Sequence, residues 1–164
     1  EVVTTLDGLI YRLKQFNPAL QVIFTVSPVR HLRDGFVENN RSKATLLNAV
    51  HHVVDKFDKL YYFPAYELVI DDLRDYRFYA EDMVHPNYAA TNYVWEKFLG
   101  ACVDPSAKEL MAELYKINAA AAHKPFNPES SAHLAFKNKY RQLCERMQQQ
   151  YPYLDFTKEL AAFS

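Results

Sequence analysis

Asp82 and His85 are the two residues whose types and spacing could carry out acid–base chemistry in this chain. A histidine that acts as a general base needs a partner that fixes its tautomer and stabilises the imidazolium it becomes. An aspartate three positions upstream in a tight turn can reach back to that ring. Pro86 follows, and it suits a helix start because it lacks a backbone N–H and presets φ. We therefore interpret the stretch as a base with its orienting carboxylate at a loop-to-helix junction, against the alternative of a surface turn with a capping role.

The elements before this turn predict a parallel sheet. Residues 20–26 are β-branched and nearly continuous in apolar character, which is typical of a central parallel strand covered on both faces. A helix with one apolar face, capped by Ser42, is predicted next. Residues 59–63 then predict a second strand, which Pro64 ends. Strand, helix and strand at this spacing predict a right-handed βαβ unit.

The position of the turn relative to these strands favours a functional site. In open α/β sheets, sites form beyond the carboxyl ends of the strands. The polar loop that begins at Ser27 and the charged, aromatic segment 66–85 both lie at such ends. This context raises the Asp82 and His85 pair above a chance coincidence of residue types.

Arginines and a histidine in the same loops are candidates for binding substrate. Arg30 and His31 follow the first strand, and Arg77 lies in the segment that leads to Asp82. Arg74 and Arg77 could hold the loop or bind an anionic substrate group. The alternatives are solvation of the first loop and surface ion pairs with neighbouring aspartates.

The second part of the chain predicts helices. One helix is predicted over 87–103, and Asp104-Pro105 is a strong start for the next, which runs to about Ala122. A linker with two prolines precedes a last long helix capped by Ser130 or Ser131, and a short tail docks on it. We predict two parts: 1–103, the carboxyl-terminal half of an α/β domain, and 104–164, a helical extension packed on it.

Composition excludes several classes of protein. The net charge of −1 gives no electrostatic footprint for nucleic acid. Cys102 and Cys144 are too few for a disulfide framework and have no metal-ligand spacing, so we expect no metal and no other cofactor. Neither a signal peptide nor an apolar run long enough to cross a bilayer is present, and a cytoplasmic setting without membrane contact is expected.

A base and its carboxylate still need a nucleophile. No serine stands in a Gly-x-Ser-x-Gly or Gly-Asp-Ser context. Ser27 is the one serine that follows a strand, but Pro28 gives it no following backbone N–H for an oxyanion hole. The residues alone thus supply half of a catalytic apparatus.

Three long segments resemble a known family. They are residues 25–35 (TVSPVRHLRDG), 62–67 (YFPAYE) and 73–86 (LRDYRFYAEDMVHP), and the likeness continues through 123–128 (HKPFNP). These segments resemble the later part of the GSCFA domain, a family that is similar to SGNH hydrolases (the GDSL esterases and lipases).

The resemblance implies a three-layer αβα, flavodoxin-like fold around a parallel sheet. It implies that Asp82 and His85 correspond to the family's D-x-x-H block, with the histidine as base of a serine hydrolase of carboxylic esters, which include O-acylated carbohydrates. The nucleophilic serine and the oxyanion-hole residues belong to earlier blocks of the family and are not in this chain. The intact family member is thus expected to be an ester hydrolase and this chain alone to be inactive.

Two other functions stay open at this stage. The chain could be a non-catalytic helical interaction module, or the same machinery could serve an acyltransferase. Because two parallel strands leave their edges open, we also expect the chain to associate with a missing amino-terminal half of the domain or with itself.

Overall fold

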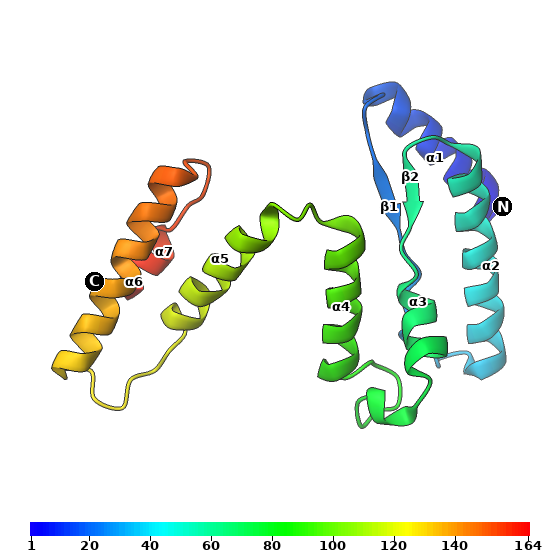
Figure 1. Cartoon of the computed structure of the whole chain (residues 1–164). Coiled ribbons are helices and arrows are strands. Elements are labelled where there is room, and N and C mark those ends of the chain that lie inside the picture. The colour runs from blue at the N-terminus through cyan, green and yellow to red at the C-terminus, as the bar shows by residue number, and fades with distance from the viewer. The chain divides into compact units, whose positions relative to one another are not determined.

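The computed structural model of the protein describes residues 1–164 and divides into two compact units, Glu1–Cys102 and Val103–Ser164 (Figure 1). Unit 1 holds a small parallel sheet with helices, and unit 2 is entirely helical. The sequence places the boundary between residues 103 and 104. The packing of the helical part on the α/β part stays a prediction.

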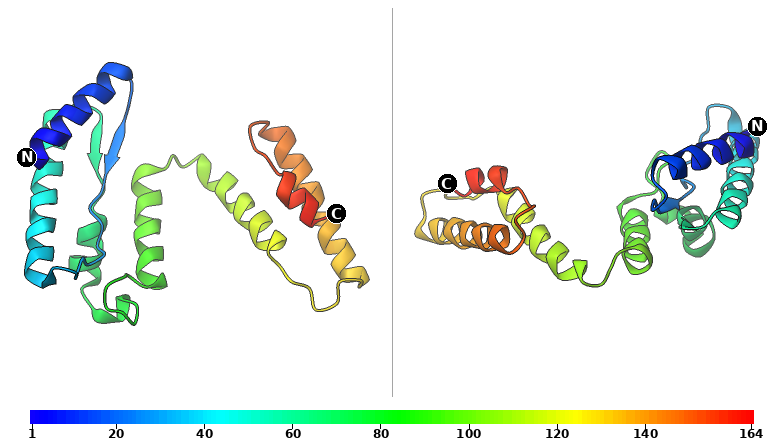
Figure 2. Two further views of the ribbon diagram at one scale, coloured as in Figure 1. Left: turned by 180° about the vertical axis from the view of Figure 1, so that it is seen from behind. Right: turned by 90° about the horizontal axis from the view of Figure 1, so that it is seen from above.

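Helices α1 (Val2–Phe16) and α2 (Gly35–Lys56) lie side by side in unit 1, as Figures 1 and 2 show. Each helix contributes fully buried apolar residues, Ile10 in α1 and Ala49 and Val53 in α2, and none of them is more than 1% exposed. The Asp7 carboxylate accepts a hydrogen bond from Lys56 Nζ at 2.7 Å. That bond is the main reason why the pKa of Asp7 lies below its usual value. The apolar contact and the ion pair fix α1 against α2.

The predicted parallel pairing is confirmed. Strand β1 (Val22–Phe24) pairs with β2 (Leu60–Tyr62) in register, Ile23 opposite Tyr61. Both strands are shorter than the sequence predicts. Pairing ends where the Phe63 N–H bonds the Phe24 carbonyl at 2.8 Å, and Pro64 beyond it has no N–H to continue the ladder.

The prediction that the first strand is covered on both faces is wrong. Tyr62 faces α2, where its ring lies 4.6 Å from that of His51. On the opposite face, Ile23 and Tyr61 are each 47% exposed. The sheet has two strands, so each strand also has one unpaired edge. The apolar run that predicted a doubly covered strand is therefore half open to solvent.

The chain after β2 folds into short helical pieces before a longer helix. They are α3 (Ala65–Glu67), the π-helical turn η1 (Leu68–Leu73) and the 3-10 turn η2 (Tyr76–Phe78), and α4 (Tyr88–Cys102) follows. The Tyr62 hydroxyl donates to both oxygens of the Glu67 carboxylate at 2.8 and 3.0 Å, which ties β2 to this segment. Phe63 packs edge-on against Phe98 of α4 at 5.1 Å between ring centroids. A short helix and an irregular approach to Asp82, as predicted, follow the strand.

Helix α2 begins earlier than the sequence indicates. The polar loop after the first strand was expected to run to Asn40, with Ser42 as the helix cap, but the helix starts at Gly35. Asn39 explains the difference, because it is buried and its Oδ1 accepts the His31 N–H at 2.8 Å. That bond secures the first turns of the helix to the loop after β1, while the remaining polar side chains face water.

Unit 2 contains α5 (Ala107–Ala121), α6 (Ser131–Gln150) and α7 (Thr157–Ala162). Ser130 caps α6 as predicted, since its Oγ accepts the His133 N–H at 3.2 Å. Asp104 and Pro105 do not start α5 directly. Asp104 instead accepts the Ser106 N–H in a turn before the helix. The predicted docking of the tail is confirmed, because one core buries residues of α5 and α6 together with the two residues that flank α7: Ile117, Ala120, Cys144, Met147, Phe156 and Phe163.

The fold is therefore mixed α/β with a two-stranded parallel sheet, followed by helices. No helix combines the length and the apolar character that crossing a bilayer requires.

We predict that Ile10→Ala destabilises unit 1 by about 2–5 kcal/mol, because it empties a fully buried site between α1 and α2. Urea denaturation followed by the fluorescence of Trp95 measures this, since Trp95 is the only tryptophan and lies in unit 1. Leu9→Ala is the matched control: Leu9 is 42% exposed, and its loss should cost less than about 1 kcal/mol. Equal effects of the two changes would contradict the interface described above.

Candidate active site

The turn between Tyr79 and Asn87 brings Asp82 and His85 into contact. His85 Nδ1 lies 2.6 Å from Asp82 Oδ2. The other carboxylate oxygen, Oδ1, accepts the backbone N–H groups of Val84 at 2.9 Å and of His85 at 3.0 Å. One carboxylate therefore closes the turn with one oxygen and holds the imidazole with the other.

These bonds set the protonation of the pair. Three donors, first the His85 N–H, then the His85 ring and the Val84 N–H, lower the pKa of Asp82 to about 2. At neutral pH Asp82 is thus a carboxylate, which can only accept hydrogen bonds. His85 Nδ1 must then carry the proton of this bond. In the neutral ring, Nε2 keeps its lone pair and can act as a base.

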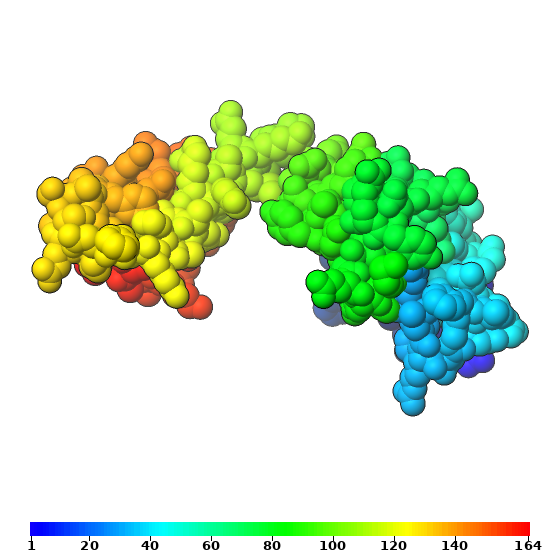
Figure 3. All heavy atoms as spheres, turned by 90° about the horizontal axis from the view of Figure 1, so that it is seen from below, coloured from blue at the N-terminus to red at the C-terminus, as the bar shows by residue number.

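The ring is accessible from solvent. The side chain of His85 is 61% exposed and that of Asp82 is 48% exposed. His85 bonds no side chain other than that of Asp82, so its Nε2 has no partner within the chain. Figure 3 views this end of unit 1, where the blue segment after β1 lies against the green segment that carries the turn. The His85 ring therefore faces outward beyond the carboxyl ends of the strands, where the sequence predicts the site.

Arg30 holds the turn from the first strand's loop. Met83 sits in the left-handed region with φ of 59°, a conformation that costs a bulky residue roughly 1–2 kcal/mol. The Arg30 guanidinium donates to the Met83 carbonyl at 2.8 Å, and the Arg30 N–H donates to the Val84 carbonyl at 3.3 Å. The guanidinium also lies 4.2 Å from the centre of the Tyr79 ring, a cation–π distance. These contacts offset the strain at Met83 and fix the turn.

Asn87 joins the turn to α4. Its side-chain amide donates to the Arg77 carbonyl at 2.6 Å, and its Oδ1 accepts the Ala90 N–H at 3.1 Å. Its own N–H bonds the Phe78 carbonyl at 2.9 Å, beside the antiparallel bridge between Tyr79 and Pro86. The helix start and the two ends of the turn are thus held by one residue.

The three predicted substrate-binding residues lie in different surroundings. Arg30 contacts the turn itself. His31 is exposed, and its Nε2 lies 3.7 Å from Asp34. The Arg77 guanidinium lies 3.5 Å from the Asp75 carboxylate. This is the surface ion pair that the sequence offers as the alternative to substrate binding. No hydrogen bond or ion pair joins His31 or the Arg77 side chain to His85. Substrate contact by these residues stays a prediction.

No nucleophile meets His85 within this chain. The Ser27 hydroxyl accepts the Val29 N–H at 3.2 Å and makes no bond to His85. Nearby, Lys43 Nζ donates to the Ser27 carbonyl at 2.6 Å, and burial lowers the pKa of Lys43. Ser27 is thus part of the support of the loop. No cluster of three or more His, Cys, Asp or Glu side chains is placed to hold a metal ion.

Sequence reasoning missed the supporting roles of Arg30 and Asn87. An asparagine directly before a helix is a familiar capping signal, so Asn87 could have been found from its position. Arg30 was expected to line a pocket, and its bond to a carbonyl 53 residues away has no signal in the sequence.

Two hollows flank the site. One, of about 190 Å³, is lined by Arg30, Val69, Ile70, Arg74, Asp75, Tyr76 and Tyr79. The other, of about 440 Å³, is an apolar groove on the open face of the sheet, lined by Ile23, Thr25, Phe63, Ala65, Thr91, Val94, Trp95 and Phe98. The first shares Arg30 with the turn that holds Asp82 and His85, and the second includes Ile23 of β1, a strand with one unpaired edge.

Comparison with known proteins gives two family matches. The sequence model of the GSCFA family matches residues 1–98, and that of the GSCFA domain protein, C-terminal domain, matches residues 115–164. No curated protein and no solved structure matches the chain. The two matches cover both units, and the first includes the turn with Asp82 and His85.

We predict that the Asp82 carboxyl titrates with a midpoint near pH 2 in the folded protein, well below the usual 3.8. Carbon-13 NMR of the side-chain carboxyl measures it. In His85→Ala the midpoint should rise to a value between about 2 and 3.8, because the ring donor is lost while both backbone donors remain. In the control His31→Ala it should stay near 2.

The lowered pKa of Asp82 also determines the direction in which pH changes the stability of the folded state. The folded state favours the ionised Asp82, so this contribution to stability is complete above about pH 4 and is lost as pH falls towards 2. A midpoint near 3.8 in the unsubstituted protein would show that the turn does not hold the carboxylate in this way.

Proposed function

Because the chain belongs to the GSCFA family, we propose that it supplies the general base and the orienting carboxylate of a serine hydrolase that acts on carboxylic esters. One observation carries the proposal: the 2.6 Å contact between His85 Nδ1 and Asp82, with Nε2 unpartnered and the ring exposed. A structural ion pair would not require the far nitrogen of the ring to stay free. The likeness of the family to SGNH hydrolases supports the choice of an ester.

The proposed reaction uses the pair in both half-reactions. A serine hydroxyl from a segment outside this chain attacks the ester carbonyl while His85 Nε2 takes its proton. Asp82 stabilises the imidazolium and keeps the ring in its tautomer. The imidazolium then protonates the departing alcohol, and an acyl-enzyme remains. Water attacks the acyl group in the same way and regenerates the serine. An alcohol in place of water would make the protein an acyltransferase.

We also propose that unit 1 is part of a larger three-layer, flavodoxin-like α/β fold. Helix α2 packs on one face of the sheet, and Phe98 of α4 contacts Phe63 by the other face. Between them, β1 has an unpaired edge beside an apolar groove that contains Trp95, which is 49% exposed. A further parallel strand on β1 and a helix over the groove would complete the layers. The added strand or helix would also carry the nucleophilic serine.

We predict that the isolated chain self-associates through this open face, because two paired strands with an apolar face are marginally stable alone. Ile23→Lys should lower the light-scattering mass towards that of a monomer, since it places a charge at the centre of the face. Leu46→Lys on the exposed side of α2 is the control and should leave the mass unchanged. A soluble, cooperatively folded monomer of the unsubstituted chain would refute the self-association.

We predict that the gene product carrying this chain hydrolyses 4-nitrophenyl acetate. His85→Ala and Asp82→Asn should each lower kcat/KM by about 10²- to 10⁴-fold. The first change removes the base, and the second removes the carboxylate that holds the imidazole in the required tautomer. His123→Ala, an exposed histidine of unit 2, is the control and should leave the rate unchanged.

The same experiment also tests the alternative function, that of a non-catalytic interaction module. Rates that do not change in His85→Ala would refute the hydrolase. They would favour the helical interaction module, with the outward-facing Tyr115 and Phe126 of unit 2 as contact residues.

A further inference from the structure

The hollow beside the catalytic turn is lined by two arginines that make no ion pair. Arg30 and Arg74 both line it. Neither guanidinium makes an ion pair. The Arg30 guanidinium donates one hydrogen bond, to the Met83 carbonyl, and the Arg74 guanidinium donates none. The acid in the wall, Asp75, is already occupied, since it accepts the Arg77 N–H at 2.8 Å and lies 3.5 Å from the Arg77 guanidinium.

Aromatic rings hold Arg30 in place. Its guanidinium carbon lies 4.2 Å from the centre of the Tyr79 ring and 5.3 Å from that of Tyr76, and both rings line the hollow. Stacking on rings leaves the in-plane N–H groups of an arginine free to bind a planar or tetrahedral oxyanion. Because one N–H holds Met83, the remaining donors are presented by a side chain that is already ordered.

The wall also contains an unmatched polar group. The Tyr79 hydroxyl is buried and has no hydrogen-bond partner. Because less than 1 Å² of this oxygen is accessible to solvent, Tyr79 contributes its ring to the hollow and not its hydroxyl.

From this geometry we propose that the Arg30 and Arg74 hollow binds an oxyanion, a carboxylate or phosphate carried by the ester substrate. This inference rests on the proposed hydrolase function for the identity of the ligand as substrate. The hollow of about 190 Å³ has room for about six water-sized groups at roughly 30 Å³ each, which suits one such anionic group. The protein would thus prefer acidic esters over neutral ones.

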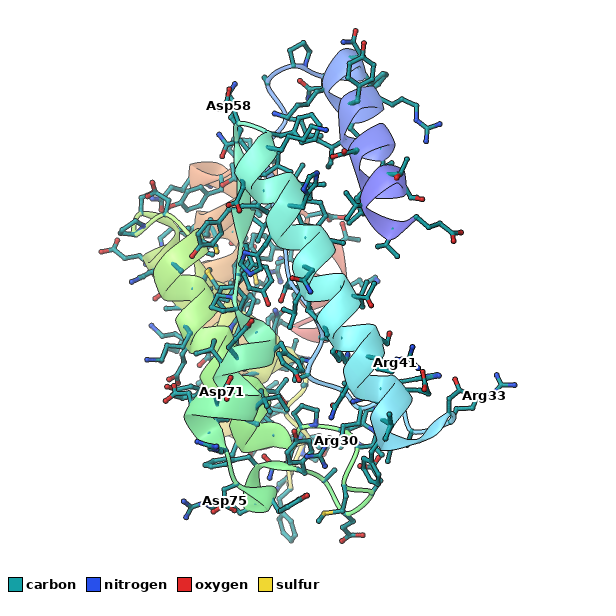
Figure 4. The ribbon with its side chains drawn as sticks, turned by 90° about the vertical axis from the view of Figure 1, so that its right-hand side faces the viewer. Arg30, Arg33, Arg41, Asp58, Asp71 and Asp75 are labelled. Carbon is teal, nitrogen blue, oxygen red and sulfur yellow. The ribbon has the colours of Figure 1, made fainter.

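The hollow is connected to the catalytic base through Arg30. The same guanidinium that faces the hollow bonds the Met83 carbonyl, two residues before His85, and Tyr79 pairs with Pro86, the residue after it. Figure 4 shows Arg30 and Asp75 at one end of unit 1 and Asp58, which precedes β2, at the other. An anion bound to Arg30 therefore lies at the end of the sheet that carries the turn.

Direct binding tests the proposal without any catalytic readout. Inorganic phosphate and succinate are titrated separately into the full chain, with chloride at matched ionic strength as the blank, and the arginine Nε–Hε signals are followed by NMR. We expect saturable shifts of the Arg30 and Arg74 signals. Arg74→Gln should weaken binding about ten-fold, the effect of losing a charge-assisted hydrogen bond.

Arg33→Gln is the matched control. Arg33 is exposed, makes no ion pair, does not line the hollow and points away from the loops around Arg30 (Figure 4). Binding of either anion that is weakened by Arg74→Gln and not by Arg33→Gln supports the site and names its chemistry. No saturable shift with either anion, or equal loss in both variants, overturns it.

The outcome is separable from that of the hydrolase proposal. Anion binding without ester turnover would remove the hydrolase and leave the oxyanion site. Turnover without anion binding would remove only the preference for acidic esters.

Discussion

The structure around the site depends on one carboxylate that makes three hydrogen bonds. Asp82 accepts the backbone N–H groups of Val84 and His85 with one oxygen and the His85 ring with the other. The bonds that close the turn and the bond that orients the imidazole are therefore made by one carboxylate. This arrangement explains how an exposed histidine keeps a fixed tautomer and direction without being buried: the backbone donors hold the carboxylate, and the carboxylate holds the ring.

The rest of unit 1 supports that carboxylate from three directions. Arg30 reaches the turn from the end of β1, Asn87 ties it to α4, and the segment from α3 to η2 delivers the chain to Tyr79. The parallel pairing of β1 with β2 places the carboxyl ends of both strands at the same edge of the sheet. Arg30, which follows β1, therefore lies close to the segment after β2 that leads to the turn and to Asn87. A short sheet is sufficient for this purpose, since only the relative position of the two strand ends matters to the site.

The sequence was informative where a single local rule decides the structure. The D-x-x-H spacing predicted the Asp82 and His85 contact, Ser130 predicted a helix start, and the strand–helix–strand order predicted parallel pairing. It was wrong where a distant contact decides. Residues 35–40 were expected to be loop, but they are helical, and within them Asn39 Oδ1 accepts the backbone N–H of His31. Likewise, the apolar run around Ile23 indicates cover on both faces, yet periodicity cannot say whether the covering element is present.

The same distinction separates the roles of the arginines. Arg30, Arg74 and Arg77 read alike in the sequence as loop cations near a strand end, and charge alone does not rank them. The structure distinguishes them by what each guanidinium already contacts: a backbone carbonyl and aromatic faces for Arg30, no acid for Arg74, and Asp75 for Arg77. An exposed ion pair contributes little to stability and leaves little charge for a ligand. The unpaired arginines, not the paired one, are therefore the positive charges at this edge of the sheet that have no carboxylate partner.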